Sequence, residues 1–364
     1  MAHSLDREVA SLLCVGFDGT VPSADVVDLI HRGVGGIILF SRNVASAEQV
    51  AELSGQLKRA AGRPLLVSID QEGGRVARLR AAQGFTELPP MRALGATGDE
   101  GLAFEAGALL GRELRAVGID QDYAPVVDVD TNPANPVIGD RSLGREPERV
   151  GRLGAALARG LQSAGVAACA KHFPGHGDTS QDSHRDLPRL PHALDRLLAV
   201  ELPPFTALSR AGVAAVMTAH VVFEALDPSR PATLSPAVLA LLRERCGFTG
   251  CCVSDDLEMK AIAEHVPLEV AAPLAVASGV DQLLVCHTPA VQHRAIDLLR
   301  RAVEDGRISH ARLAEARQRV AHLLGWAGPP PDPAAARQAL RTPEALALAA
   351  RIPAMGVGRD PTAA

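Results

Sequence analysis

Eight short apolar runs recur along this chain, and each is followed by a stretch whose apolar residues have the spacing of a helix. The runs are continuously hydrophobic rather than alternating, which is typical of strands buried on both faces of a parallel sheet. They cover residues 12–17, 35–40, 64–70, 122–129, 167–173, 214–220, 251–256 and 282–287. Eight strand–helix repeats with no second set of strands predict an α/β fold of the closed (β/α)8 type, a TIM barrel. An open, doubly wound sheet is the alternative fold.

The segments between these runs carry apolar residues three and four apart, and several lie between a cap residue and a glycine. These features predict helices over residues 24–33, 46–62, 148–165, 235–247 and 309–326. We therefore assign residues 1–327 to a single barrel domain. Residues 328–364 form a short C-terminal extension, for which we expect one helix and a partly disordered end.

The composition excludes several classes of protein. Of the 364 residues, 47% are hydrophobic and 22% are charged, which excludes wholesale disorder. The net charge of −5 gives no general attraction to nucleic acid or to anionic membranes. No apolar run reaches the roughly 18 residues of a transmembrane helix. The first residues lack the apolar core of a secretion signal, and the six cysteines form no CxxC pair, so we expect a cytoplasmic protein. We also expect a monomer.

Charged residues follow four of the predicted strands. Asp70 ends the third run, Lys171 and His172 end the fifth, His220 ends the sixth, and Asp255 and Asp256 end the seventh. In a TIM barrel these strand ends meet on one rim, where active sites lie. Burying such charges costs several kcal/mol unless they are paired or used, so we expect a site there.

The loop of residues 171–188 concentrates His172, His176, Asp178, Asp182 and His184. Histidine and aspartate at short spacing can bind zinc, which favours a metal site. Alternatively, Asp182 orients His184 and stabilises its charged form, which gives a proton shuttle. The loop by itself leaves both interpretations open.

Asp255 stands at the mouth of an apolar strand, opposite this loop. A fixed carboxylate facing a proton donor is the layout of a retaining glycosidase. An aspartate in such a place more often caps the next helix, and we expect Asp256 to take that role and to leave Asp255 for chemistry.

Five motifs, in order, resemble glycoside hydrolase family 3, and most of all its single-domain bacterial β-N-acetylglucosaminidase branch. They lie at residues 69–79, 124–147, 171–184, 216–220 and 253–259. The resemblance implies a (β/α)8 barrel and a double-displacement mechanism. It implies that Asp255 is the nucleophile, that His184 is the general acid/base and that Asp182 is the partner of His184. It also implies that the hydroxyls of the terminal sugar are held by Asp70, Arg78, Arg141, Lys171 and His172.

The expected activity is removal of terminal β-linked N-acetylglucosamine, without a cofactor or metal, from a small carbohydrate such as a peptidoglycan fragment. Aromatic residues are only 3% of the chain, which favours a small polar pocket over a long stacking cleft. We expect His176 and Asp178 to hold the loop and His220 to support the site. Phosphorolysis and β-glucosidase activity are alternatives on the same scaffold. A metal-dependent hydrolase using His172, His176 and His184 and a non-catalytic sugar-binding protein are alternatives of other classes.

Overall fold

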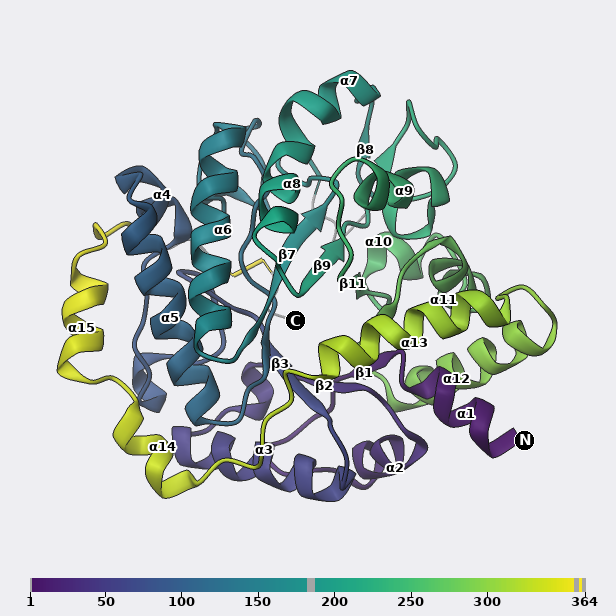
Figure 1. Cartoon of the computed structure of the whole chain (residues 1–364), viewed down its shortest axis with the longest axis horizontal. Coiled ribbons are helices and arrows are strands. Elements are labelled where there is room, and N and C mark those ends of the chain that lie inside the picture. Colours follow the sequence, from purple (N-terminus) through teal and green to yellow (C-terminus); the bar gives the residue numbers. More distant parts are fainter. Residues whose placement is uncertain (1, 182–186, 357–359, 362–364) are drawn as a thin grey trace.

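The computed structural model describes residues 2–181, 187–356 and 360–361, and a closed barrel of parallel strands lies at its centre (Figure 1). Its strands are β1 (Leu13–Val15), β2 (Gly36–Leu39), β3 (Leu66–Ile69), β6 (Gln121–Asp122), β7 (Ala167–Phe173), β9 (Ala215–Thr218), β11 (Cys251–Asp256) and β12 (Gln282–Val285). They pair in this order, and β12 closes the barrel on β1. The predicted (β/α)8 barrel is confirmed, and a closed sheet excludes the doubly wound alternative.

Helices surround the barrel (Figure 1). They are α1 (Ala2–Ala10), α2 (Ala24–Arg32), α3 (Ala47–Ala61), α4 (Met91–Thr97), α5 (Glu100–Ala116), α6 (Pro147–Ser163), α7 (Leu194–Arg196), α8 (Leu202–Arg210), α9 (Pro236–Glu244), α10 (Lys260–Ala263), α11 (Leu268–Ser278), α12 (Pro289–Glu304) and α13 (His310–Leu324). Serine side chains cap the starts of α2, α3, α9 and α13 as predicted, whereas α6 has no side-chain cap and α9 ends at Arg245 rather than at a glycine. Ser23 accepts the N–H of Val26 at the start of α2, and Gly33 ends that helix in the left-handed conformation that glycine adopts without strain.

Short elements lie in the connections. Two small sheets are formed by β4 (Gln71–Gly73) with β5 (Val76–Ala77), and by β8 (Arg189–Leu190) with β10 (Val222–Phe223). The 3₁₀ segments are η1 (Ser41–Asn43), η2 (Ala81–Gln83), η3 (Gly139–Arg141) and η5 (Ala232–Leu234), and η4 (Leu197–Glu201) is a π-helical turn. The β4–β5 hairpin follows β3 directly, so it starts at the rim where the site was expected.

The fourth strand is shorter than predicted. The sequence predicts a strand over 122–129, whereas β6 holds only Gln121 and Asp122. The reason is Pro125, which has no N–H to donate to a sheet, so regular pairing stops before it. Beyond the proline only Val126 forms an isolated bridge, to Lys171 of β7. Asp128 therefore lies in a loop at the rim rather than in a strand.

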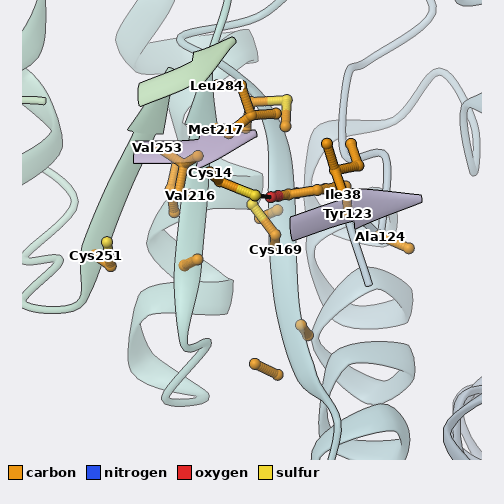
Figure 2. Close-up of a cluster of buried hydrophobic side chains, with 14 of the residues drawn as sticks. Cys14, Ile38, Tyr123, Ala124, Cys169, Val216, Met217, Cys251, Val253 and Leu284 are labelled. Atoms are coloured by element: carbon orange, nitrogen blue, oxygen red, sulfur yellow. Dashed lines mark hydrogen bonds between the residues drawn. The ribbon is translucent and has the colours of Figure 1, made fainter. Parts of the chain in front are cut away.

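Side chains fill the inside of the barrel (Figure 2). Cys14, Ile38, Cys169, Val216 and Leu284 come from five different strands and are all buried. Tyr123 joins them, and its hydroxyl lies 3.5 Å from Cys14 Sγ and accepts a hydrogen bond from Ser68 Oγ at 3.2 Å. Because the interior is packed, a ligand can enter only at the rim.

The C-terminal extension holds two helices, α14 (Pro333–Ala339) and α15 (Pro343–Ala350), where the sequence suggested one. Each begins with a cap that sequence reasoning overlooked, since Asp332 accepts the N–H of Ala334 and Thr342 that of Ala345. In Figure 1, α14 lies near α3 and α15 lies outside α5. None of the helices in the described part of the chain has the length and hydrophobicity needed to cross a membrane.

We predict that Phe205→Ala lowers the free energy of unfolding by about 3–5 kcal/mol, because it leaves a cavity between α8 and the barrel. The Phe205 side chain is fully buried, and its ring meets that of Phe173 edge to face with centroids 5.2 Å apart. Denaturant unfolding measures the change. Phe104→Ala is the matched control, since Phe104 is 39% exposed, and we expect a change within about 0.5 kcal/mol. Equal losses in the two variants would contradict the described packing.

Candidate active site

A narrow pocket of about 110 Å³ opens at the carboxyl ends of the barrel strands. Apolar side chains of the barrel interior form part of its lining, and charged side chains form the rest. Its residues are Ile38, Phe40, Asp70, Arg78, Val137, Arg141, Lys171, His172, His176, Met217, Asp255, Asp256, Met259, Leu284, Cys286 and His287. A larger cavity of about 1120 Å³ lies near the other ends of the strands, beside α1, α2 and α13. Catalytic groups of TIM barrels gather at the carboxyl ends, so we assign the site to the smaller pocket.

Ion pairs link the charged side chains of the pocket into a continuous series. Lys171 Nζ lies 2.6 Å from Asp70 Oδ1 and 2.7 Å from Glu72 Oε1. Arg141 binds Glu72 with two nitrogens, both at 2.8 Å, in the bidentate geometry that arginine and carboxylate favour. On the other side, Arg78 Nη2 donates to Asp70 Oδ2 at 3.3 Å. These ion pairs join Asp70 and Arg78, which directly follow β3 and β5, to residues of β4, β7 and η3 at one rim.

These pairings keep the buried side chains charged. Burial alone would lower the pKa of Lys171, but Asp70 and Glu72 outweigh it and raise that pKa above its usual value. Burial would raise the pKa of Asp70, yet Lys171 and Arg78 bring it below the ordinary range. For Glu72, burial is likewise outweighed by Arg141 and Lys171, and the pKa is strongly lowered. Oriented donors and acceptors in permanent ionic form suit a ligand rich in hydroxyl groups.

Asp128 organises the start of the loop after β7. Its carboxylate lies 2.7 Å from His172 Nδ1 and accepts the backbone N–H of His176, also at 2.7 Å. A charged carboxylate can only accept, so His172 Nδ1 carries a proton that it donates to Asp128. Burial, followed by the nearby His172, lowers the pKa of His176 to about 4. The His176 ring is therefore neutral, and its Nδ1 pairs with Thr179 at 2.8 Å.

Asp255 and Asp256 lie side by side at the end of β11 and differ in their contacts. Asp255 lines the pocket, and its Oδ1 accepts the N–H of Asp256 at 2.9 Å. Asp256 accepts the N–H of Glu258 and of Cys286, and its Oδ2 lies 3.1 Å from His287 Nε2. The expectation that Asp256 caps the following helix is wrong, because α10 starts at Lys260 without a side-chain cap. Asp256 instead joins β11 to the segment that follows β12.

His220 contacts the backbone at the same end of β11. Its Nε2 lies 3.0 Å from the carbonyl oxygen of Asp256 and its Nδ1 lies 2.8 Å from Thr233 Oγ1. A carbonyl only accepts, so Nε2 carries the proton. Burial lowers the pKa of His220, which keeps the ring in this neutral form. The backbone that carries Asp255 and Asp256 is thereby held in place.

The structure brings six of the eight predicted site residues to one pocket, namely Asp70, Arg78, Arg141, Lys171, His172 and Asp255. Asp182 and His184 lie outside the described residues. Asp178 contacts Thr131 at 2.8 Å and His192 at 2.9 Å, away from the lining of the pocket. No group of three or more metal-binding side chains occurs in residues 2–181, 187–356 and 360–361.

Sequence reasoning missed Glu72, Asp128 and His287. Glu72 stands two residues after Asp70 in the same motif, and this proximity was a usable signal. His287 ends the eighth apolar run and fits the rule that identified the other strand ends. Asp128 lay inside a predicted strand, so its role could not be recognised before the strand was known to stop at Asp122.

The comparisons with known proteins agree with this geometry. The model of the glycosyl hydrolase family 3 N terminal domain matches residues 4–323. The chain belongs to glycoside hydrolase family 3. This family 3 protein is therefore a glycosidase, and it is 45% identical to a β-hexosaminidase of Methylococcus capsulatus over 74% of its own length and 81% of the relative.

Two solved structures resemble this family 3 enzyme over nearly its whole length. A family 3 β-N-acetylglucosaminidase from Paenibacillus sp. superimposes with a TM-score of 0.89 at 45% identity, covering 96% of this chain and 68% of the other. NagZ from Neisseria gonorrhoeae, in complex with N-trifluoroacetyl-D-glucosamine, superimposes with a TM-score of 0.79 at 35% identity, covering 94% and 96%.

We predict that the stabilising effect of His287 depends on pH. The hydrogen bond to Asp256 raises the pKa of His287 above its usual value, although partial burial acts in the opposite direction. A histidine whose pKa is higher in the folded than in the unfolded state stabilises the folded protein, and this stabilisation is complete at pH values below the unfolded-state pKa. The stabilisation is lost as the pH rises through the folded-state pKa. The difference in Tm between wild type and His287→Gln should therefore be larger at pH 5.5 than at pH 8.5.

The control for this prediction is His310→Gln, which replaces an exposed histidine on α13. We expect that variant to follow the pH profile of the wild type. A His287→Gln effect that is constant or grows with pH would show that the ion pair with Asp256 does not form.

Proposed function

We propose that this enzyme is an exo-acting, retaining β-N-acetylhexosaminidase that removes terminal β-linked N-acetylglucosamine. One observation carries the proposal. The Asp255 carboxylate lines the same narrow pocket as Asp70, Lys171 and His172, so a sugar ring held by those side chains lies within reach of a carboxylate. The similarity to named β-hexosaminidases and β-N-acetylglucosaminidases supports the choice of sugar.

In the proposed first step, a carboxylate oxygen of Asp255 bonds to the anomeric carbon while the bond from that carbon to the departing oxygen breaks. His184, charged and oriented by Asp182, gives its proton to the departing oxygen. In the second step neutral His184 takes a proton from water. The water oxygen bonds to the anomeric carbon, and the bond to Asp255 breaks. Two inversions retain the β configuration. The backbone N–H of Asp256 fixes the rotation of the Asp255 carboxylate for both steps.

The sugar hydroxyls are proposed to bind Asp70, Arg78, Arg141, Lys171 and His172. The carboxylate of Asp70 accepts from hydroxyls, and the cations donate to them. Because Asp70 is held by Lys171 and Arg78, its oxygens are oriented before the substrate arrives. The small volume of the pocket, about 110 Å³, supports a single ring and action at chain ends.

Several finer points belong to the same proposal. We infer that residues 1–327 form the catalytic barrel and that residues 328–364 are an appended extension. We infer a monomer in the cytoplasm, and the six buried, unpaired cysteines suit such a reducing compartment. Fragments of peptidoglycan are the proposed natural substrates, and chitin fragments and glycoconjugates are the alternatives.

We predict that Asp255→Ala lowers kcat/KM on an aryl β-N-acetylglucosaminide by about a thousandfold or more, because the covalent intermediate can no longer form. A 2-deoxy-2-fluoro or related slow substrate should label the wild type on the peptide that holds Asp255, as mass spectrometry detects. Activity of Asp255→Ala close to the wild type would refute the proposed mechanism.

Asp297→Ala serves as the control, because it removes a half-exposed carboxylate of α12 that pairs with Arg32 far from the pocket. The wild type is assayed in parallel on an aryl β-glucoside, and with phosphate present. Preference for the glucoside, or formation of sugar phosphate in place of free sugar, would replace the proposed activity by one of its alternatives.

We predict that the loss of activity in His184→Ala depends on how strongly the departing oxygen of the substrate needs a proton. The loss in kcat/KM should be about 10²–10⁴-fold on a disaccharide and far smaller on a dinitrophenyl glycoside, whose departing oxygen needs no proton. Asp182→Asn should show the same dependence more weakly, because it acts through the imidazole. Equal losses on both substrates would exclude His184 as the proton donor.

A further inference from the structure

The segment that holds the proposed general acid/base lies between two described flanks, residues 176–181 and 187–192. The first flank is bound to residues 131–135, in the loop that follows β6. Asn135 Nδ2 donates to the carbonyl oxygen of His176 at 2.8 Å. Further hydrogen bonds join the same two segments, from Asn132 Nδ2 to the carbonyl oxygen of Thr179 at 3.1 Å and from Thr131 Oγ1 to Asp178 Oδ1 at 2.8 Å. The first flank is therefore fixed relative to the end of β6.

The second flank is bound to the segment that follows β9. β8 lies in this flank and pairs with β10. The N–H of Val222 donates to the carbonyl oxygen of Pro188 at 2.9 Å, and a second bond of the same length follows along the pair. Just before β10 stands His220, whose Nε2 lies 3.0 Å from the carbonyl oxygen of Asp256. The second flank is therefore connected to the strand end that carries Asp255.

A side-chain contact joins the two flanks directly. Asp178 Oδ2 lies 2.9 Å from His192 Nε2, while Oδ1 of the same carboxylate accepts the hydrogen bond of Thr131. The His192 side chain is 11% exposed and that of Asp178 is 27% exposed, so solvent screens the contact only in part. In the sequence, 13 residues lie between Asp178 and His192, and the proposed acid/base is among them.

The helix that follows His192 packs against the start of the same loop. α7 begins at Leu194 and continues into the π-helical turn η4, which ends with Glu201. A Cβ atom at Gly175 would lie 2.7 Å from Glu201 Cγ, so the backbone approaches this side chain as only glycine allows. Arg196 Nη2 lies 3.0 Å from Glu201 Oε1 and holds that carboxylate. His192 and Glu201 thus connect one helical unit to two places in the first part of the loop.

We propose that His192 is a positioning residue for the proposed general acid/base. Through its contact with Asp178 it closes the base of the segment that carries Asp182 and His184, and it thereby sets where the imidazole of His184 can reach. A chain segment closed at its base samples fewer arrangements, and a small displacement of a catalytic group costs much of its effect on the rate. The inference rests on the proposed function, because it concerns the acid/base of that reaction, and it adds a residue outside the five motifs.

The test compares His192→Ala with the full-length wild type on two substrates. On a disaccharide of N-acetylglucosamine, kcat/KM should fall by about tenfold or more, because protonation of the departing oxygen is impaired. On the dinitrophenyl glycoside, whose departing oxygen needs no proton, the loss should stay below about twofold. The inhibition constant of free N-acetylglucosamine should not change, since the side chains of the sugar pocket are untouched.

Three further variants separate the contact from general effects of substitution. His192→Gln places an amide N–H close to the position of Nε2 and should recover most of the lost activity. Asp178→Asn alters the contact from its other partner and should show the same dependence on the substrate as His192→Ala. His293→Ala is the matched control, because it removes a partly buried histidine of α12 that lies 3.9 Å from Asp28, and it should behave like the wild type.

A double variant shows whether His192 acts through His184. On the disaccharide, the variant with both His184→Ala and His192→Ala should be no slower than His184→Ala alone. Losses that add up in the double variant would overturn the proposal. Equal losses of His192→Ala on the disaccharide and on the dinitrophenyl glycoside would overturn it as well.

Hydrogen exchange tests the contact without turnover. The backbone amides of residues 176–181 and 187–192 should exchange several-fold faster in His192→Ala than in the wild type, and at the wild-type rate in His192→Gln. Unchanged exchange in His192→Ala would overturn the proposal. A His184→Ala variant with full activity on the disaccharide would refute the proposed function and this inference together, whereas a loss in His184→Ala without one in His192→Ala would overturn this inference alone.

Discussion

The contact on which the pocket depends is that of Lys171 with two carboxylates, Asp70 at 2.6 Å and Glu72 at 2.7 Å. It joins β7 to the end of β3 and to the hairpin that follows β3. Three charged groups this deeply buried would each be costly alone, and they are stable only together. The ammonium ion also fixes both carboxylates in direction. Recognition of a ligand at this rim therefore begins with an arrangement that exists before any ligand binds.

Asp255 lines the same pocket from a different strand. Asp70 follows β3, Glu72 lies in β4 and Lys171 lies in β7, whereas Asp255 lies near the end of β11. Its Oδ1 accepts the N–H of Asp256, and the carbonyl oxygen of Asp256 lies 3.0 Å from His220 Nε2. A carboxylate held in direction is prepared to attack a ring whose hydroxyls are bound by side chains of other strands. The barrel thus divides sugar binding and the proposed chemistry between different strands.

Much of this could be predicted from sequence because a simple rule applies. The charged residues that end buried parallel strands must meet at one rim, and Asp70, Lys171 and Asp255 follow from that rule directly. The same rule could not identify Glu72 and Asp128 as site residues, since their importance comes from the partners that the fold brings to them. Asp128 was also harder to identify because the apolar run predicted a strand through it, whereas Pro125 ends regular pairing before it. A contact such as that of Asp360 with Arg78 leaves no local trace in the sequence.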